Sequence, residues 1–335
     1  METVYFLGID VSKKKLDTAL TLDGVNMHEN QIENNPAAIK SFIHLLRKEF
    51  NFPLSQLVVC MEHTGIYCQP FLDFAVSKKV NVCLEPALQI KQSQGMTRGK
   101  NDQVDAKRIA AYAFKNRQEL KFWKPQRLTL QKLKTLLVVR ERLIKMRVQL
   151  EVPINETAEF LETSLRSMVK TQCNKTLKAV HSDIVKVDRQ IDILIKDDTK
   201  LSDQMKWATS VPGVGKITAA NVIVESGELE RISEVKKFAC YAGIAPFEHR
   251  SGSSIRGKTR VSKMANMTIK RLLHLAAMSA IQCCEELKIY YHRKLAEGKN
   301  KMSALNAVRN KLISRIFACL KGQRTYQKTY LNILA

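Results

Sequence analysis

Apolar and polar positions alternate or recur along the first 117 residues in the patterns that strands and helices require. Short apolar or alternating runs predict strands at 3–10, 16–22, 26–33, 57–62 and 80–84. Longer segments between and after them predict helices at 36–50, 66–78 and 102–117. Asn35 is a plausible cap for the first helix, and Pro36 suits its first turn. Three early strands followed by alternating helices and strands indicate an α/β sheet.

The pattern becomes helical from about Leu128, where a long basic helix is expected to run to Leu150. A second set of positions then recurs at alternating steps of four and three, which is a heptad seam: Cys173, Leu177, Val180, Ile184, Val187, Ile191, Leu194, Asp198 and Leu201. Pro153 is expected to break the helix between the two segments. They could form a coiled coil between subunits or a helical hairpin within one chain, and the pattern leaves both open.

These changes predict three domains. An α/β domain at 1–122 precedes a linker of basic helix and coiled coil at 123–204, and a C-terminal helical domain occupies 205–335. A chain of 335 residues is long enough for such a division.

Charge is unevenly spread over these segments. The formal net charge is +23, yet residues 1–105 carry 11 Lys and Arg against 12 Asp and Glu, which leaves 44 against 20 for residues 106–335. A basic body beside a locally acidic segment suits a polyanionic substrate such as nucleic acid. A generally basic protein without a catalytic site is the plain alternative.

The balanced segment holds four acidic residues at informative places. Asp10 and Glu62 end apolar runs, and Asp102 and Asp105 lie three apart on one face of a predicted helix. Carboxylates gathered in this way supply the hard oxygen ligands that Mg²⁺ prefers, so the four are candidate metal ligands and catalytic residues. The same residues could instead serve as helix caps or first-turn acids.

Two further motifs lie in the C-terminal part. TSVPGVGKITAANVIVE at 209–225 is a helix-hairpin-helix pattern, whose glycine turn and Lys216 could bind a phosphate. A polar loop rich in Ser, Gly and Arg then precedes a basic helix, and it contains Ser251 as a candidate nucleophile, with Ser253 and Ser254 as rivals. Seven basic residues around it are candidate nucleic-acid ligands: Arg250, Arg256, Lys258, Arg260, Lys263, Lys270 and Arg271. A Ser/Gly loop is most often only a loop.

The eight cysteines form no CxxC pair, which favours free thiols and a reducing cytoplasm. The sequence shows no membrane-spanning run and no N-terminal signal, so we expect a soluble cytoplasmic protein without a membrane partner.

Five segments together resemble the DEDD transposases of bacterial insertion sequences, relatives of the Piv-type DNA invertases. FLGIDVSKKKLDTAL, VVCMEHTGIY and GKNDQVDAKRIA are similar to the N-terminal half of that family, and SVPGVGKITAANVIVE and YAGIAPFEHRSGSSIRGKTRVSKMANMTIKRLL to its C-terminal half. The resemblance runs from residue 3 to about 285. One departure is Ala265, where the family often has Gly, which suggests either a turn without positive φ or continuous helix there.

The resemblance implies a RuvC-like domain of the RNase H fold, a coiled-coil connection and a helical transposase domain. It places the DEDD ligands of Mg²⁺ on Asp10, Glu62, Asp102 and Asp105, and the nucleophile of a covalent serine–DNA intermediate on Ser251. It also implies a dimer or tetramer, donor and target DNA, a structured guide RNA (bridge RNA), and a location at the bacterial nucleoid. Two alternatives stay open: a RuvC-like junction nuclease that uses water, and a non-catalytic nucleic-acid-binding protein.

Overall fold

The computed structural model describes residues 4–93, 102–251, 255–261 and 265–328. The chain divides into two compact units, Met1–Pro125 and Gln126–Ala335. The predicted boundary at 122/123 lies close to this division, whereas the contacts do not separate the predicted linker from the C-terminal domain. None of the helices in the described ranges combines the length and apolar character that crossing a membrane requires.

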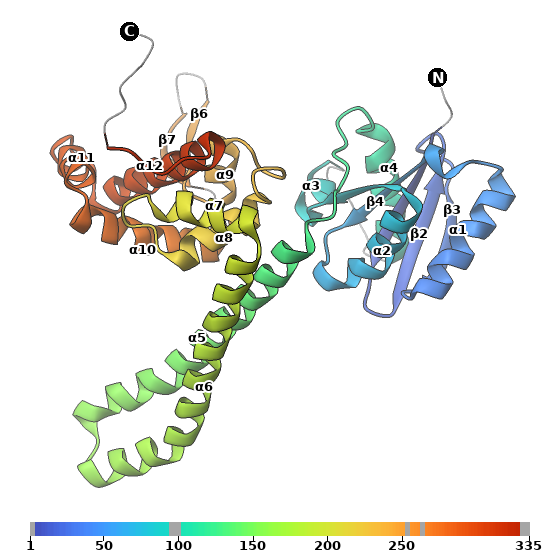
Figure 1. Ribbon diagram of the computed structural model, residues 1–335. Helices are drawn as coiled ribbons and strands as arrows, with labels where there is room; N and C mark the ends of the chain where they lie inside the picture. The colour runs from blue at the N-terminus through green and yellow to red at the C-terminus, as the bar shows by residue number, and fades with distance from the viewer. Residues whose placement is uncertain (1–3, 94–101, 252–254, 262–264, 329–335) are drawn as a thin grey trace. The chain divides into compact units, whose positions relative to one another are not determined.

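The first unit is built on a five-stranded sheet of order β3-β2-β1-β4-β5 (Figure 1). Its strands are β1 (Tyr5–Val11), β2 (Lys15–Thr21), β3 (His28–Glu33), β4 (Leu57–Glu62) and β5 (Asn81–Glu85). The first three strands form an antiparallel meander, and β4 and β5 run parallel to β1. All five predicted strands are therefore confirmed.

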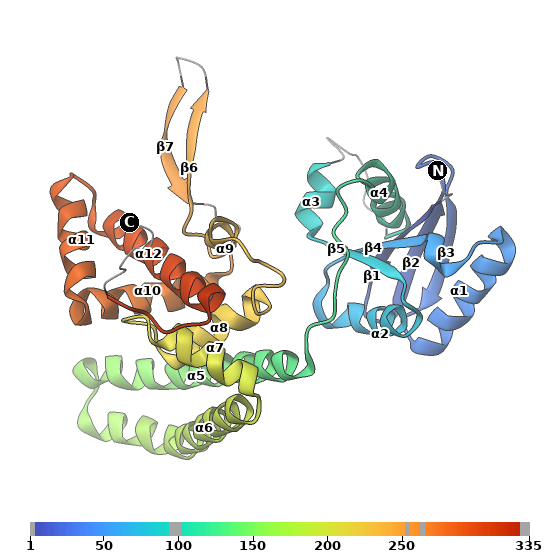
Figure 2. The ribbon, with the colours of Figure 1, turned by 45° about the horizontal axis from the view of Figure 1, so that its top comes forward.

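The helices of this unit cover both faces of the sheet, which lies between α4 and the pair α1 and α2 (Figure 2). They are α1 (Pro36–Phe50), α2 (Gln69–Lys78), α3 (Ala87–Gln92) and α4 (Asp102–Lys115). Asn35 caps α1 as expected, because its side chain accepts a hydrogen bond from the Ala38 backbone N–H. Short helix α3 after Pro86 was not predicted, and a 3₁₀ turn at Gly65–Cys68 precedes α2.

Alternation along β1 sends successive side chains to opposite faces of the sheet. Leu7 and Ile9 are fully buried in the core formed with α1 and α2. Phe6 belongs to the core on the other face, formed with α4. Gly8 and Asp10 have the same parity as Phe6, so they also face α4.

Helix α4 lies unusually close to β1 at Gly8. A Cβ atom at this position would lie 2.3 Å from the Ala110 backbone N and 2.4 Å from the Ala106 carbonyl oxygen. Ala106 and Ala110 are fully buried, and their small side chains allow the backbones to approach. This contact fixes the start of α4 next to the end of β1 that carries Asp10.

The second unit is mostly helical. Its helices are α5 (Leu128–Phe160), α6 (Thr163–Asp197), α7 (Thr199–Thr209), α8 (Lys216–Ser226), α9 (Val235–Tyr241), α10 (Met267–Cys283), α11 (Glu285–Ala296) and α12 (Lys301–Gly322). One large core joins the base of the α5–α6 pair to helices α7 to α12. Helix α12 carries several basic residues, but much of it is core, with Leu312, Ile316 and Phe317 fully buried.

Helices α5 and α6 lie side by side as a hairpin within one chain (Figure 1). Pro153 lies inside α5, so the expected break there was wrong. A proline removes one backbone hydrogen bond, but the surrounding turns of this long helix continue to Phe160. A coiled coil between subunits stays a prediction.

The heptad seam ends earlier than the sequence pattern indicated. Ile184 and Ile191 are buried as seam positions should be, but α6 ends at Asp197. Asp198 then caps α7, since its side chain accepts a hydrogen bond from the Leu201 backbone N–H at 2.9 Å. The same carboxylate is bound by Arg127 at 2.8 Å. Asp198, the charged residue of the predicted seam, therefore lies at the break between α6 and α7. The seam of α6 does not extend to Leu201, although the spacing of four and three residues does.

The expected polar loop around Ser251 is instead a β-hairpin. Strands β6 (Pro246–Ser251) and β7 (Ile255–Val261) pair in antiparallel fashion, with a register irregularity between Phe247 and His249. Asn266 caps the following helix, which begins at Met267. Ala265 therefore lies outside that helix, so a continuous helix at this position, one of the two explanations for the missing Gly, is wrong.

The approach of α4 to β1 makes a stability prediction. Replacing Gly8 with Ala should lower the free energy of unfolding by about 2 kcal/mol or more, because the added Cβ clashes with backbone atoms that cannot rotate away. Denaturant unfolding of the full chain, followed by circular dichroism, measures this loss. Gly215→Ala is the control, since a Cβ there meets nothing within 4 Å. Equal stability of the two variants would contradict the close packing.

Candidate metal centre

Three strands present an acidic residue on the α4 face of the first unit's sheet. Asp10 and Asp17 are register partners on β1 and β2. Glu62 ends β4 and has the parity of Val58 and Cys60, which belong to the core on that face. Because alternate residues of a strand share one face, the three carboxylates project on the side that α4 covers.

The first turn of α4 adds two more acids, Asp102 and Asp105. One carboxylate oxygen from each of Asp10, Asp17 and Asp102 lies within 4.8 Å of the others. Asp105 is half-buried, and Arg108 donates to it from the next turn at 2.9 Å. The structure thus brings the strand acid Asp10 and the helix-start acid Asp102 together, and this close group does not include Glu62 or Asp105.

The charges of the other three predicted acids act on Asp10. Burial, followed by the negative charges of Asp102, Glu62 and Asp105, raises the pKa of Asp10 to about 6. The charge of Asp17 makes a smaller contribution in the same direction. A carboxylate whose ionisation is opposed by several like charges gains by binding a cation.

Asp17 was missed by the sequence analysis. It is fully buried, and its Oδ1 accepts a hydrogen bond of 2.6 Å from Gln31 Nε2 on β3. Its signal was present as the one charged residue inside the apolar run LDTALTL. An acid in the middle of a buried strand needs a partner, which makes it a candidate for a site.

A basic side chain, Lys15, also lies at this acidic group. Lys15, the first residue of β2, places its Nζ 3.1 Å from Asp17 Oδ2 and 2.9 Å from Asp102 Oδ2. These contacts raise the pKa of Lys15, and the hydrogen bond to Asp102 contributes more than the one to Asp17. Lys107, on the following turn of α4, instead pairs with Glu29 of β3 at 2.6 Å.

The donor set fits a hard divalent cation. Carboxylate oxygens are the ligands of Mg²⁺, whereas zinc sites draw on Cys and His. Among the described residues the cluster contains neither Cys nor His. Asp10, Asp17 and Asp102 can contribute one ligand atom each, and Glu62 and Asp105 lie within electrostatic range of Asp10.

The remaining predicted site residues lie in the second unit. Ser251 is the last residue of β6 and pairs with Ile255. Arg250, Arg256, Lys258 and Arg260 belong to the same hairpin. Side chains from 248 to 260 are outside those that the structure describes, and so is Lys263.

The predicted helix-hairpin-helix segment forms a helix, a turn and a second helix, α7 and α8. Gly213 in the turn has a φ of +84°, and a Cβ there would lie 2.6 Å from the Ala276 carbonyl oxygen of α10. Lys216, expected beside a phosphate, pairs with Asp192 of α6 at 2.7 Å. Phosphate binding by this turn stays a prediction.

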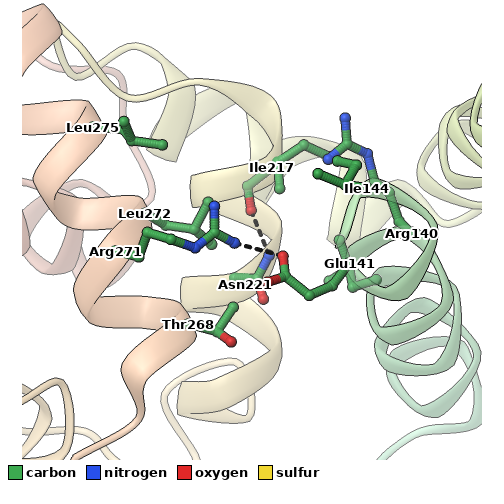
Figure 3. A pocket seen from close by; sticks show the side chains of 10 residues that line it. Arg140, Glu141, Ile144, Ile217, Asn221, Thr268, Arg271, Leu272 and Leu275 are labelled. Carbon is green, nitrogen blue, oxygen red and sulfur yellow. Dashed lines mark hydrogen bonds and ion pairs between the residues drawn. The ribbon is translucent and has the colours of Figure 1, made fainter. Parts of the chain in front are cut away.

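Lys270 and Arg271 lie on α10, as expected for the basic helix. Arg271 pairs with Glu141 of α5 beside a pocket of about 220 Å³ among α5, α8 and α10, and the two side chains point toward each other (Figure 3). Arg140, on the rim of the same pocket, pairs with Asp188 of α6 at 2.6 Å. Two of the predicted nucleic-acid ligands, Lys216 and Arg271, therefore neutralise acids of their own unit.

Two transposase families match this sequence. Residues 7–161 match the family described as DEDD transposase of IS110, and residues 205–292 match the IS116/IS110/IS902 transposase family. The first match contains all four predicted acids, and the second contains Ser251.

Relatives extend the match along the chain. The pilin gene-inverting proteins of Moraxella lacunata and Moraxella bovis are each 25% identical over 96% of this chain and 98% of theirs. The transposase for insertion sequence element IS1111A of Coxiella burnetii is 24% identical over 68% of both chains.

Solved structures give a weaker likeness. A structure of T. thermophilus RuvC in complex with a Holliday junction substrate is 16% identical to this chain, with a TM-score of 0.29. The likeness covers 36% of this chain and 99% of that one, and at this score it adds nothing to the assignment. From its two matching domains and its homology to the pilin gene-inverting proteins, the chain belongs to the IS110/IS116/IS902 family of DEDD transposases.

Proposed function

We propose that this transposase cuts and rejoins DNA through a covalent serine–DNA intermediate, with Ser251 as nucleophile and Mg²⁺ held by Asp10, Glu62, Asp102 and Asp105. The relatives are named for inverting a pilin gene and for transposing an insertion sequence, and both outcomes require DNA strands to be broken and joined again. The chain's basic excess outside residues 1–105 suits a nucleic-acid substrate.

The observation that carries the proposal is the gathering of acidic side chains around Asp10. Burial and the charges of Asp102, Glu62 and Asp105 oppose its ionisation. Such an arrangement is electrostatically unfavourable without a cation, and carboxylates perturbed in this way cluster at functional sites. When bound there, Mg²⁺ would withdraw charge from the oxygens of a scissile phosphate.

The chemistry of the step is a transesterification. The Ser251 hydroxyl oxygen forms a bond to phosphorus while the bond to the DNA 3′ oxygen breaks, and the proton of the hydroxyl ends on that oxygen. The products are a phosphoserine linkage and a free 3′-OH. A 3′-OH of another strand can then reverse the reaction, so the exchange conserves bond energy and needs no nucleoside triphosphate.

A structured guide RNA and a dimer or tetramer complete the proposal, as the family resemblance implies. Specificity would then come from base pairing between RNA and DNA, while the protein binds phosphates and duplex shape. Sequencing of RNA that co-purifies with the chain, together with the mass of the purified complex, tests both parts.

The second candidate is a metal-dependent junction nuclease in which water attacks and Ser251 only contacts phosphate. The acidic cluster supports it equally well, because a metal pair also serves hydrolysis. A non-catalytic nucleic-acid-binding protein is the third, in which the acids are structural. The fate of Ser251 variants separates the first two candidates.

The decisive experiment traps covalent protein–DNA adducts in cells that carry the gene with its native flanks. We expect adducts in the wild type, with DNA attached at Ser251 by mass spectrometry, and their loss by at least about 100-fold in Ser251→Ala and Asp10→Ala. Ser253→Ala is the matched control, since it removes a hydroxyl two positions away and should keep the adduct.

Other outcomes contradict the proposal in different ways. Breaks without adducts that survive Ser251→Ala but not Asp10→Ala would establish the hydrolytic nuclease. Unchanged DNA in every strain, with the protein still bound to it, would favour the binding protein.

The raised pKa of Asp10 predicts the pH dependence of metal binding. Protons and Mg²⁺ compete for this carboxylate, so Mg²⁺ affinity should be flat above pH 6 and fall by up to about tenfold per unit below pH 6, where Asp10 is protonated. Isothermal titration of the full chain between pH 5 and 8 measures it. Asp10→Asn should bind weakly with no step near pH 6, and a pH-independent wild type would refute this role of Asp10.

A further inference from the structure

A cation of the protein itself lies within the acidic cluster. The Lys15 Nζ is 2.9 Å from Asp102 Oδ2 and 3.1 Å from Asp17 Oδ2. Asp102 and Asp17 are two of the three residues whose carboxylate oxygens gather within 4.8 Å of one another. The ammonium group therefore neutralises carboxylates at the place where a divalent ion would bind.

Both the backbone and the ammonium group of Lys15 are held in place. Its backbone carbonyl accepts a hydrogen bond from the Ser12 N–H at 3.0 Å, which closes the turn between β1 and β2. Its ammonium is held by Asp17, whose own position is set by complete burial and by the 2.6 Å bond from Gln31. The Lys15 ammonium therefore has two carboxylate partners, the buried Asp17 and the half-exposed Asp102.

Lys15 differs in its surroundings from the two lysines that precede it. Lys13 and Lys14 are exposed in the turn, and over the described ranges neither forms an ion pair. Lys15 carries the same charge, but it is the first residue of β2 and shares the face of Asp17.

We propose that the Lys15 ammonium competes with the divalent metal for Asp102: it holds that carboxylate in the metal-free protein and leaves it when the ion binds. The inference rests on the proposed function, because it takes the Asp10 cluster as the metal site. Two cations sharing one carboxylate repel each other over a few ångströms, so occupancy by one weakens the other. Buried Asp17 keeps the displaced ammonium at the site.

This arrangement has a consequence for the metal-free protein. Without Lys15, Asp102 would face the other carboxylates with one neutralising charge fewer. In the metal-free protein the lysine therefore holds the start of α4 against β1 and β2. The same contact lowers the affinity of the site for the metal. Lys15 is on this account a positioning residue.

The first test is metal binding by the full chain at pH 7.5, measured by isothermal titration with Mg²⁺ and with Mn²⁺. Lys15→Met should bind the ion on the order of tenfold more tightly than wild type, because the competing charge is gone. Lys14→Met removes the same charge one residue away and should stay within about twofold, since an exposed charge is screened.

A second pair of variants guards against misfolding. Lys15→Met leaves the buried Asp17 carboxylate without its ammonium partner. The double variant Lys15→Met/Asp17→Asn is therefore compared with Asp17→Asn alone. Melting curves of the wild type and of these three variants show whether each protein is folded. Loss of Lys15 should tighten metal binding in both backgrounds.

A direct readout follows the ammonium itself. Acetic anhydride labelling, read by mass spectrometry, should modify Lys15 several-fold faster with saturating Mg²⁺ than without, while Lys14 labelling stays unchanged. Unchanged or weaker metal binding by the Lys15 variants, or Lys15 labelling that does not rise, would overturn the competition and leave the metal site intact. Absence of metal binding by wild type and every variant would overturn the competition together with the proposed function.

Discussion

The close contact between Gly8 and helix α4 is the constraint on which the acidic site depends. Only hydrogen at this position lets the backbone at Ala106 and Ala110 lie directly on β1. The contact sets the depth and direction of α4, whose first turn then carries its two acids to the end of β1. A larger residue would lift the helix and separate helix acids from strand acids.

At the start of α4, apolar packing therefore opposes the repulsion between the acidic side chains. The apolar contacts of α4 with both β1 and β2 hold like charges together. Burial, followed by the repulsion between these charges, raises the pKa of Asp10. Lys15 and Arg108 offset part of it from the rim. A bound divalent ion would offset the rest, which is why the same geometry serves both stability without metal and affinity for it.

The second unit distributes its charges differently. Arg127, just before α5, binds both Asp198 at the start of α7 and the buried carboxylate of Glu228 after α8. Lys200 also pairs with Glu228, at 2.7 Å. Lys216 and Arg271, two of the predicted nucleic-acid ligands, are likewise paired with acids of the unit. Net charge alone overstates how many remain for a phosphate backbone, since it does not show which lysines and arginines are already paired.

The sequence by itself determined the strands and most helices, because alternation and caps are local properties. It also singled out Asp10, Glu62, Asp102 and Asp105 as candidate metal ligands. It also supported the family, since five motifs occur in order. Only the tertiary structure decided that Asp17 joins the cluster, that Lys15 lies on Asp102, and that Asp198 ends a helix. Each of these depends on strand register or on contact with a residue far along the chain, such as Gln31 or Arg127, and local patterns carry no record of such distances.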